Sequence, residues 1–213
     1  SGFLAKHNPF IRHIVCRTRP FLEQKINPET HESYLTPIKV RLFGEDETDA
    51  IHLTTYLQDA YRHAEEFCQL LKERIKASGF IQTILLQRVG SSMYAGLQTA
   101  QGILNNRAEE FIEDDDTVSA EALYEHASFK NLTQAEIDTL KLFVEALENH
   151  LEDDPKYHRM KQLLTEPVIE EKWLNRGCIV FSQYFDTIYW IAEKLARDLP
   201  HETFGMYAGG DKS

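Results

Sequence analysis

The most constraining feature of the sequence lies in its last forty residues, where two apolar runs flank an amphipathic stretch. Residues 178–181 read CIVF, and four apolar residues in succession are typical of a strand buried on both faces of a parallel sheet. In residues 186–199 apolar side chains recur every three or four positions, which predicts a helix covering such a sheet. Residues 203–210 provide a second candidate strand. A strand, a helix and a strand in this order predict a βαβ unit and therefore an α/β fold.

The middle of the chain carries helical periodicity, so the predicted α/β chain is rich in helix. Apolar residues recur at intervals of three and four in two long segments, residues 50–77 and residues 80–105, the second interrupted by Gly-Ser-Ser. Thr133 and Glu136 have the spacing of a capping box, which predicts a further helix over 134–151.

The first fifty residues contain a candidate strand and a group of arginines. In residues 36–43 apolar and basic side chains alternate, which is typical of a half-buried strand. Upstream, Arg12, Arg17 and Arg19 lie close together in the sequence. Guanidinium groups bind carboxylates and phosphates equally well, so the arginines fit both structural ion pairs and phosphate contacts. The sequence leaves both open.

The formal net charge of −11 is concentrated in the middle of the chain. Residues 104–154 hold 15 acidic and 3 basic residues, a net charge of −12, so the remainder sums to +1. We expect the acidic segment to avoid DNA and to suit a basic protein partner, while the rest remains compatible with nucleic acid. The three cysteines show no CxxC spacing, which favours a reducing, cytoplasmic setting, and no apolar run is long enough to span a membrane.

Several motifs that would identify a self-contained enzyme are missing from the sequence. It contains no GxxxxGK[ST] phosphate loop, no GxGxxG turn after a strand and no GxSxG nucleophile elbow. The nine histidines show no HExxH spacing, and the acidic run at 109–116 lacks the alternating ligands of a calcium loop. The sequence therefore predicts neither catalytic residues nor a metal site.

Polar residues directly follow the first candidate strand. Ser182, Gln183 and Tyr184 come after residues 178–181, and ligands of open parallel sheets bind beyond the carboxyl ends of the strands. The alternative is that the three are turn residues ahead of a helix capped by Asp186. The pattern leaves a ligand site and a simple turn equally open.

Three blocks of sequence, in this order, resemble segments of the Swi/Snf-like ATPases of helicase superfamily two. IRHIVCRTRPFLE resembles the arginine-rich end of the first lobe, with Arg17, Thr18 and Arg19 matching and Cys16 replacing a basic residue. LLQRVGSSMYAGLQTAQGIL resembles a helix that precedes the second lobe. DPKYHRMKQLL, followed by GCIVFSQYFDTIYWIAEKL, resembles the opening of the second lobe with helicase motif IV. In the last two blocks the matching residues are Arg88, Ser91, Ser92, Ala95, Asp154, Pro155, Lys156, Phe181, Ser182, Gln183, Tyr184, Asp186 and Thr187.

The resemblance implies the tail of a first RecA-like lobe over 1–45, a helical, acidic interlobe region over 46–153 and the start of a second RecA-like lobe with a parallel sheet over 154–213. It implies a fragment of an ATP-dependent DNA helicase or translocase that uses ATP and Mg²⁺ in the whole protein, has DNA as its partner, and is inactive alone because the phosphate loop is missing. Contacts with nucleic acid or between lobes are implied for Arg17, Arg19, Arg88, Ser182, Gln183 and Tyr184. The alternative function is that of an acidic helical protein-interaction module.

Overall fold

The computed structural model describes residues 18–37, 42, 50–74, 78–106, 131–167 and 172–207, and the chain divides into two units, Ser1–Ala50 and Ile51–Ser213. In the first unit, helix α3 (Arg19–Gln24) begins with a proline in its first turn. A turn follows it, held by a β-bridge between Ile26 and Ser33.

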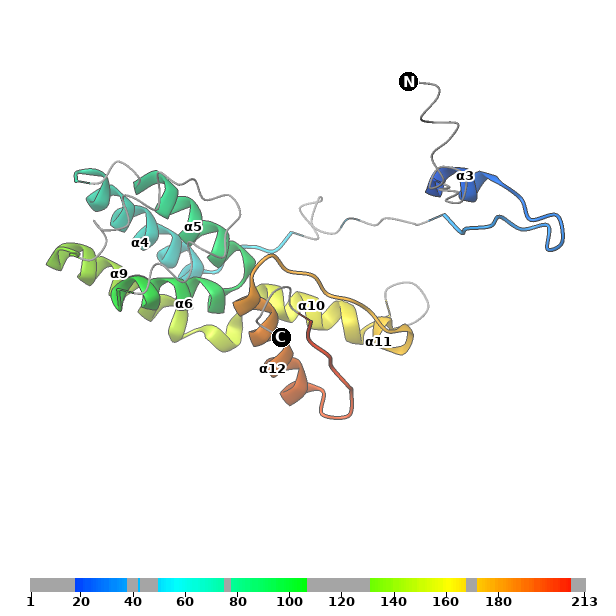
Figure 1. Cartoon of the computed structure of the whole chain (residues 1–213). Coiled ribbons are helices and arrows are strands. Elements are labelled where there is room, and N and C mark those ends of the chain that lie inside the picture. Colours follow the sequence, from blue (N-terminus) through cyan, green and yellow to red (C-terminus); the bar gives the residue numbers. More distant parts are fainter. Residues whose placement is uncertain are drawn as a thin grey trace, which may run out of the picture. The chain divides into compact units, whose positions relative to one another are not determined.

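Helices build the second unit (Figure 1). They are α4 (Thr55–Lys72), α5 (Ser78–Ser91), α6 (Met93–Leu104), α9 (Gln134–Glu148), the 3-10 helix η2 (Leu151–Asp153), α10 (Pro155–Thr165), α11 (Trp173–Arg176) and α12 (Phe185–Asp198). α4 lies along both α5 and α9, and α6 packs against α5 and α9, so these four helices form one bundle. None of the described helices combines the length and the apolar character that crossing a bilayer requires.

The core of the bundle consists of the apolar faces that the helical periodicity predicts. Phe67, Leu71 and Phe143 are fully buried in it, and the aliphatic side chains Leu57, Leu85, Leu97, Leu140 and Leu147 are buried beside them. α5 and α6 approach each other closely at Gly96, because a methyl group at that position would overlap the side chain of Val89. Burial of aliphatic and aromatic side chains is the dominant stabilising contribution in such a bundle.

Two local signals in the sequence mark helix boundaries, one where a helix start was predicted and one inside a segment predicted as a single interrupted helix. The capping box is present, since Glu136 N–H donates to Thr133 Oγ1 (3.3 Å) and Thr133 N–H donates to Glu136 Oε2 (2.7 Å). The segment predicted as a helix over 80–105 is divided into α5 and α6 at Ser92, where the backbone is extended (φ −156°, ψ 154°). Ser92 caps the second helix by accepting a hydrogen bond from Ala95 N–H (3.1 Å).

A second, smaller cluster joins α10 to α12. It contains Tyr157, Leu164, Trp190 and Leu195, all buried. Tyr94 of α6 extends this cluster, because its ring is stacked with that of Trp190 at a centroid distance of 6.2 Å. α12 therefore contacts α6 of the bundle as well as α10.

The predicted α/β fold with a RecA-like parallel-sheet lobe is wrong for the described part of the chain, which contains helices and two isolated bridges but no strand. Residues 178–182 form irregular chain, with Ile179 79% exposed and Phe181 87% exposed. A strand needs a neighbour that shares its backbone hydrogen bonds. Residues 203–207 are also irregular, and no backbone hydrogen bond among the described residues joins the two segments.

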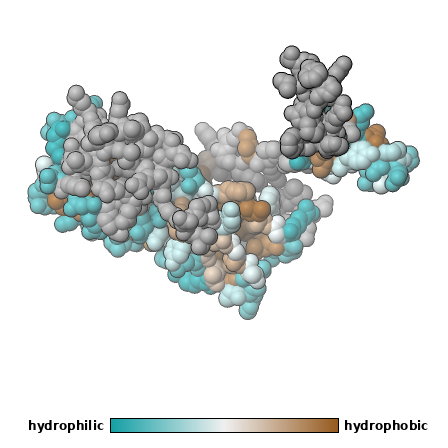
Figure 2. All heavy atoms as spheres, viewed as in Figure 1, coloured by the Kyte–Doolittle hydropathy of each residue, from teal (hydrophilic) through white to brown (hydrophobic). Residues whose placement is uncertain are grey.

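The two apolar segments nevertheless lie along one groove beside α12. Figure 2 shows hydrophobic side chains gathered on this part of the surface. The two segments line this open apolar groove of about 620 Å³ together with Leu164, Leu174, Ile188, Ile191 and Leu195. Of the strand predicted over 36–43, the structure describes only Thr36, Pro37 and Leu42, and none of these three is in a strand. The predicted boundaries after residues 45 and 153 remain predictions.

Candidate functional site: a polar junction between α5, α10 and α12

A buried arginine joins the end of α5 to the start of α12. Arg88 is 2% exposed, and its Nη1 lies 3.3 Å from Asp186 Oδ2. The guanidinium carbon lies 4.7 Å from the centre of the Tyr184 ring, a cation–π distance. The Tyr184 hydroxyl in turn donates to Gln87 Oε1 (3.4 Å). The ion pair, the cation–π contact and the hydrogen bond together hold the start of α12 against the last turns of α5.

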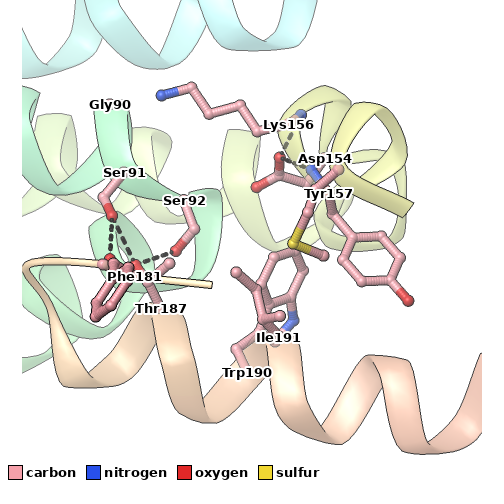
Figure 3. Close-up of a pocket in the computed structure, with 12 residues that line it drawn as sticks. Gly90, Ser91, Ser92, Asp154, Lys156, Tyr157, Phe181, Thr187, Trp190 and Ile191 are labelled. Carbon is pink, nitrogen blue, oxygen red and sulfur yellow. Dashed lines mark hydrogen bonds between the residues drawn. The ribbon is translucent and has the colours of Figure 1, made fainter. Parts of the chain in front are cut away.

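Four hydroxyl groups continue this contact (Figure 3). Ser91 Oγ lies 3.2 Å from Ser182 Oγ and 2.9 Å from Thr187 Oγ1, and Ser92 Oγ lies 2.9 Å from Thr187 Oγ1. Tyr184 N–H donates to Ser182 Oγ (3.3 Å), which folds the turn ahead of α12. Because Ser92 also caps α6, the same cluster joins three helices.

Asp154 connects α10 to α6. Its side chain is 1% exposed and caps α10 by accepting from Lys156 N–H (2.9 Å) and Tyr157 N–H (3.2 Å). Its other oxygen accepts from Met93 N–H (2.8 Å), in the first turn of α6. One carboxylate therefore satisfies N–H groups of two helix N-termini, where negative charge is favourable.

A cavity of about 210 Å³ lies between these groups. It is lined by the four hydroxyl residues and by Gly90, Asp154, Lys156, Tyr157, Met160, Phe181, Trp190 and Ile191. Burial lowers the pKa of the Lys156 ammonium, and the charge of Asp154 opposes this effect. The lining combines hydrogen-bond donors, one cation and an aromatic wall, which suits binding of an acceptor group.

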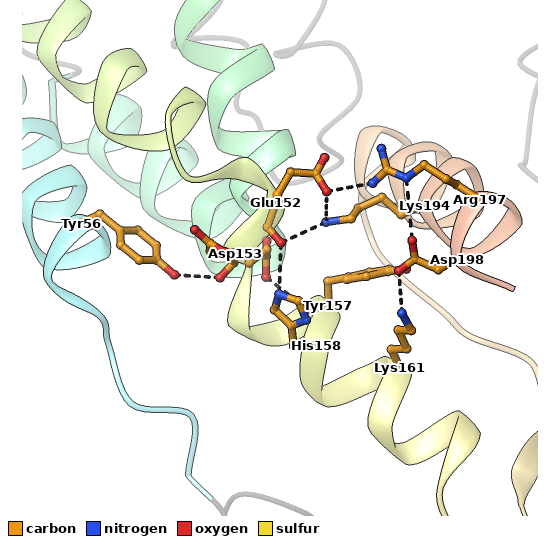
Figure 4. A network of polar contacts seen from close by, with 10 residues as sticks. Tyr56, Glu152, Asp153, Tyr157, His158, Lys161, Lys194, Arg197 and Asp198 are labelled. Carbon is orange, nitrogen blue, oxygen red and sulfur yellow. Dashed lines mark hydrogen bonds and ion pairs between the residues drawn. The ribbon is translucent and has the colours of Figure 1, made fainter.

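A charged network lies on the other side of Tyr157 (Figure 4). Lys194, 5% exposed, lies over the rings of Tyr157 (4.4 Å) and Trp190 (4.9 Å) and pairs with Glu152 (3.3 Å). Hydrogen bonds from Lys161 Nζ (2.7 Å) and from the Tyr157 hydroxyl (2.8 Å) lower the pKa of Asp198. Burial, followed by the hydrogen bond to Asp198, raises the pKa of Tyr157. These contacts fix α12 on α10.

The structure brings together three of the six residues for which the sequence implied contacts. Arg88, Ser182 and Tyr184 meet at the junction, and Gln183 between them is exposed. Arg19 lies in the first unit, where its Nε pairs with Glu23 Oε1 at 2.7 Å. Arg17 lies outside the described residues.

Sequence reasoning did not select five further residues of the junction as site residues, namely Ser91, Ser92, Asp154, Lys156 and Thr187. All five belong to the blocks that carry the Swi/Snf resemblance, which is the signal that points to them. Asp186 does not cap α12 as the sequence suggested. It lies in the first turn and binds Arg88, while Tyr184 occupies the N-cap position but its side chain makes no capping hydrogen bond to the helix.

No group of three histidine, cysteine or acidic side chains suited to a metal ion occurs among the described residues. Comparison of the chain with family models, with curated proteins and with solved structures finds no match. The junction is therefore interpreted from its own geometry and from the sequence blocks that meet there.

Proposed function

We propose that this chain is part of a Swi/Snf-like, ATP-dependent DNA translocase, in which it forms the helical region between the two halves of the motor and the segment that follows it. One observation supports the proposal above all. Residues of two sequence blocks that resemble this family are direct partners in the fold, as in the pairs Arg88–Asp186, which are 98 positions apart, and Ser92–Thr187, which are 95 positions apart. Asp154, at the start of the third block, also contacts the second block, because it accepts a hydrogen bond from Met93 N–H.

In this function ATP and Mg²⁺ bind elsewhere in the whole protein, because phosphoryl transfer needs a phosphate loop that this sequence lacks. In this function the junction has a mechanical role, which is to couple the movement of α12 to that of α5. Arg88 is buried and paired, so it resists sliding of α12 along α5, and movement on one side is passed to the other. DNA is the partner of the whole protein.

The test is an ATPase assay with and without duplex DNA. The product of the complete reading frame should hydrolyse ATP faster with DNA, and the 213-residue chain alone should release no phosphate. In the complete protein, Arg88→Gln should lower the DNA-stimulated rate several-fold while ATP binding is retained. Arg62→Gln is the matched control, because Arg62 is an exposed arginine that pairs with Asp59 and Glu66 on α4.

Absence of DNA-stimulated hydrolysis by the complete product would contradict the proposal, as would a reading frame that encodes no GxxxxGK[ST] loop. Equal rates for Arg88→Gln and Arg62→Gln would contradict the mechanical part alone. Circular dichroism of both variants separates a lost fold from a lost coupling.

The apolar groove on α12 favours a second candidate function, a protein-interaction module. Phe181 (87%) and Tyr207 (90%) are highly exposed beside it, and large apolar side chains gathered on a surface are typical of binding sites. Much of the acidic segment that first suggested this function, residues 107–130, lies outside the described residues. A complete product that lacks ATPase activity, together with a partner whose binding is lost on Phe181→Ser, would favour this function over the motor.

A further inference from the structure

The hydroxyl cluster at the junction has one hydrogen more than its own contacts use. Ser91, Ser92, Ser182 and Thr187 supply four O–H groups, and three contacts join them. Each contact uses one hydrogen. Two of the oxygens already accept from backbone N–H groups, those of Ala95 and Tyr184. Within the described part of the chain, one O–H is therefore left to donate to another acceptor, and all four residues line the cavity.

Lys156 brings a positive charge to the same cavity. Among the described residues no carboxylate lies within ion-pair distance of its ammonium, although the negative charge of Asp154 is near enough to raise the pKa of Lys156. Both oxygens of Asp154 are already occupied by backbone N–H groups. Lys156 is an exposed residue, but the atoms around its ammonium partly desolvate it and lower its pKa, so an anion beside it would be stabilising. Figure 3 shows the Lys156 side chain reaching toward the α5 end at Gly90.

Gly90 is unexplained by packing. It lies inside α5, where glycine is less favourable than alanine, and it lines the cavity. A Cβ atom added to it would meet no atom within 4 Å in the structure, in contrast to Gly96 at the contact with Val89. The absence of a side chain at Gly90 therefore leaves room in the cavity rather than room for a neighbouring helix.

We propose that this cavity binds a phosphate group, held by the Lys156 ammonium and by the spare hydroxyl of the serine–threonine cluster, with Gly90 giving it access. Lysine binds phosphate as a point charge, and the one spare hydroxyl can donate a hydrogen bond to another oxygen of the same group. The positive charges of Lys156 and Arg88 balance the negative charges of Asp154 and Asp186. A phosphate group is therefore attracted to the Lys156 ammonium itself and not by a net charge of the junction. The ligand is either free phosphate or a phosphodiester of nucleic acid, and the inference does not depend on the proposed function.

The first experiment titrates inorganic phosphate into the whole 213-residue chain at constant ionic strength and follows amide NMR signals of Ser91, Ser92 and Thr187. Saturable shifts are expected for the natural sequence, with at least ten-fold weaker binding for Lys156→Gln. Lys141→Gln is the matched control, since it removes one exposed lysine charge on α9 and should leave binding unchanged. General exclusion of phosphate from protein surfaces acts equally on all three proteins.

Gly90→Ala provides a variant that should remain folded, because alanine favours the helix and meets no neighbour. It is expected to melt no lower than the natural sequence and to bind phosphate more weakly. The proposal is overturned if no saturable shift occurs, or if Lys156→Gln and Gly90→Ala both bind phosphate as the natural sequence does.

A second experiment distinguishes the source of the phosphate group by measuring binding of a fluorescent DNA duplex at several salt concentrations. If a phosphodiester is the ligand, Lys156→Gln should reduce the slope of log affinity against log salt by about 1, whereas Lys141→Gln should not. If DNA binding is the same in both variants while phosphate binding is lost in Lys156→Gln, the ligand is free phosphate. Loss of neither form of binding in Lys156→Gln overturns the proposal.

Discussion

Replacing Asp154 should weaken two helices at once. The carboxylate accepts hydrogen bonds from Lys156 N–H and Tyr157 N–H in α10 and from Met93 N–H in α6. The first N–H groups of a helix have no acceptor within the helix, so each depends on an outside partner. Asp154 is 1% exposed and Met93 is 1% exposed, so water replaces the carboxylate poorly.

The magnitude follows from the two sets of bonds. Asp154→Ala removes the cap of α10, which costs about 0.5–2 kcal/mol. It also leaves the buried Met93 N–H without an acceptor, which costs about 1–3 kcal/mol. If the two losses add, the free energy of unfolding falls by about 1.5–5 kcal/mol. For a chain of this length, each kcal/mol lowers the melting temperature by about 2–4 °C.

Urea unfolding followed by circular dichroism measures this loss, and Asp154→Ser separates its two parts. The serine side chain can cap α10, but it is too short to also accept the hydrogen bond from Met93 N–H. The free energy of unfolding should therefore fall by about 1–3 kcal/mol in this variant, less than in Asp154→Ala. Asp138→Ala is the control, because Asp138 is exposed on α9 and its loss should cost no more than about 0.5 kcal/mol. If Asp154→Ala unfolds like this control, or if serine is as damaging as alanine, the double role of Asp154 is refuted.

Three further changes test the packing and the charges. Arg74→Ala should cost about 3 kcal/mol in urea unfolding, because it removes the cation that binds the 1% exposed carboxylate of Glu136 at 2.8 and 2.6 Å and leaves this charge only the hydrogen bond from Thr133 N–H. A loss below about 1 kcal/mol would contradict this. Val180→Asp should change the free energy of unfolding by less than about 0.5 kcal/mol, since Val180 is 39% exposed. If this variant unfolds, Val180 is buried after all and an exposed, irregular segment at this position is wrong. Because hydrogen bonds from Lys161 and Tyr157 lower the pKa of Asp198, its contribution is present above the ordinary aspartate pKa and is lost as pH falls through the lower, folded-state value. The stability difference between the natural sequence and Asp198→Asn should therefore shrink as the pH falls below about 4, and a difference that stays constant down to pH 2 would rule this out.

The helices were predictable because their signals are local. The capping box at Thr133 and Glu136 predicts the start of α9, and the apolar periodicity predicts the face that α4 buries. For α12 the periodicity predicts the helix but not its buried face, because the helix buries Thr187, Trp190, Lys194 and Leu195 while Ile188 and Ile191 line the open groove. Both signals depend only on residues three or four positions apart, which the sequence displays directly. The end of α5 was signalled in the same way, by the Gly-Ser-Ser sequence that precedes α6.

The strand prediction failed because a strand is not a local structure. The apolar run at 178–181 fits a sheet interior, but it becomes a strand only if another segment pairs with its backbone. Among the described residues none does, and the run instead lines a groove on α12. Length and composition of a run carry no information on its pairing partner, so a strand and an irregular apolar segment look alike in the sequence.

The junction was hidden for a related reason. Arg88 and Asp186 are 98 positions apart, and no spacing rule connects them. From the sequence, Asp186 was expected to cap a helix, which is the more common role of aspartate at such a position. In the fold it binds the buried guanidinium of Arg88 instead, and hydrogen bonds to charged groups are stronger than those between neutral ones.

The polar character of this junction also restricts how α12 can dock. An apolar contact between α5 and α12 would tolerate small rotations, because hydrophobic attraction has no direction. The Arg88–Asp186 pair and the Ser92–Thr187 hydrogen bond are lost within a small displacement, and a buried arginine without its partner is costly. Intermediate positions of α12 are therefore disfavoured, and the contact is either made or broken. A contact of this kind therefore restricts the position of α12 on α5 more narrowly than apolar packing would.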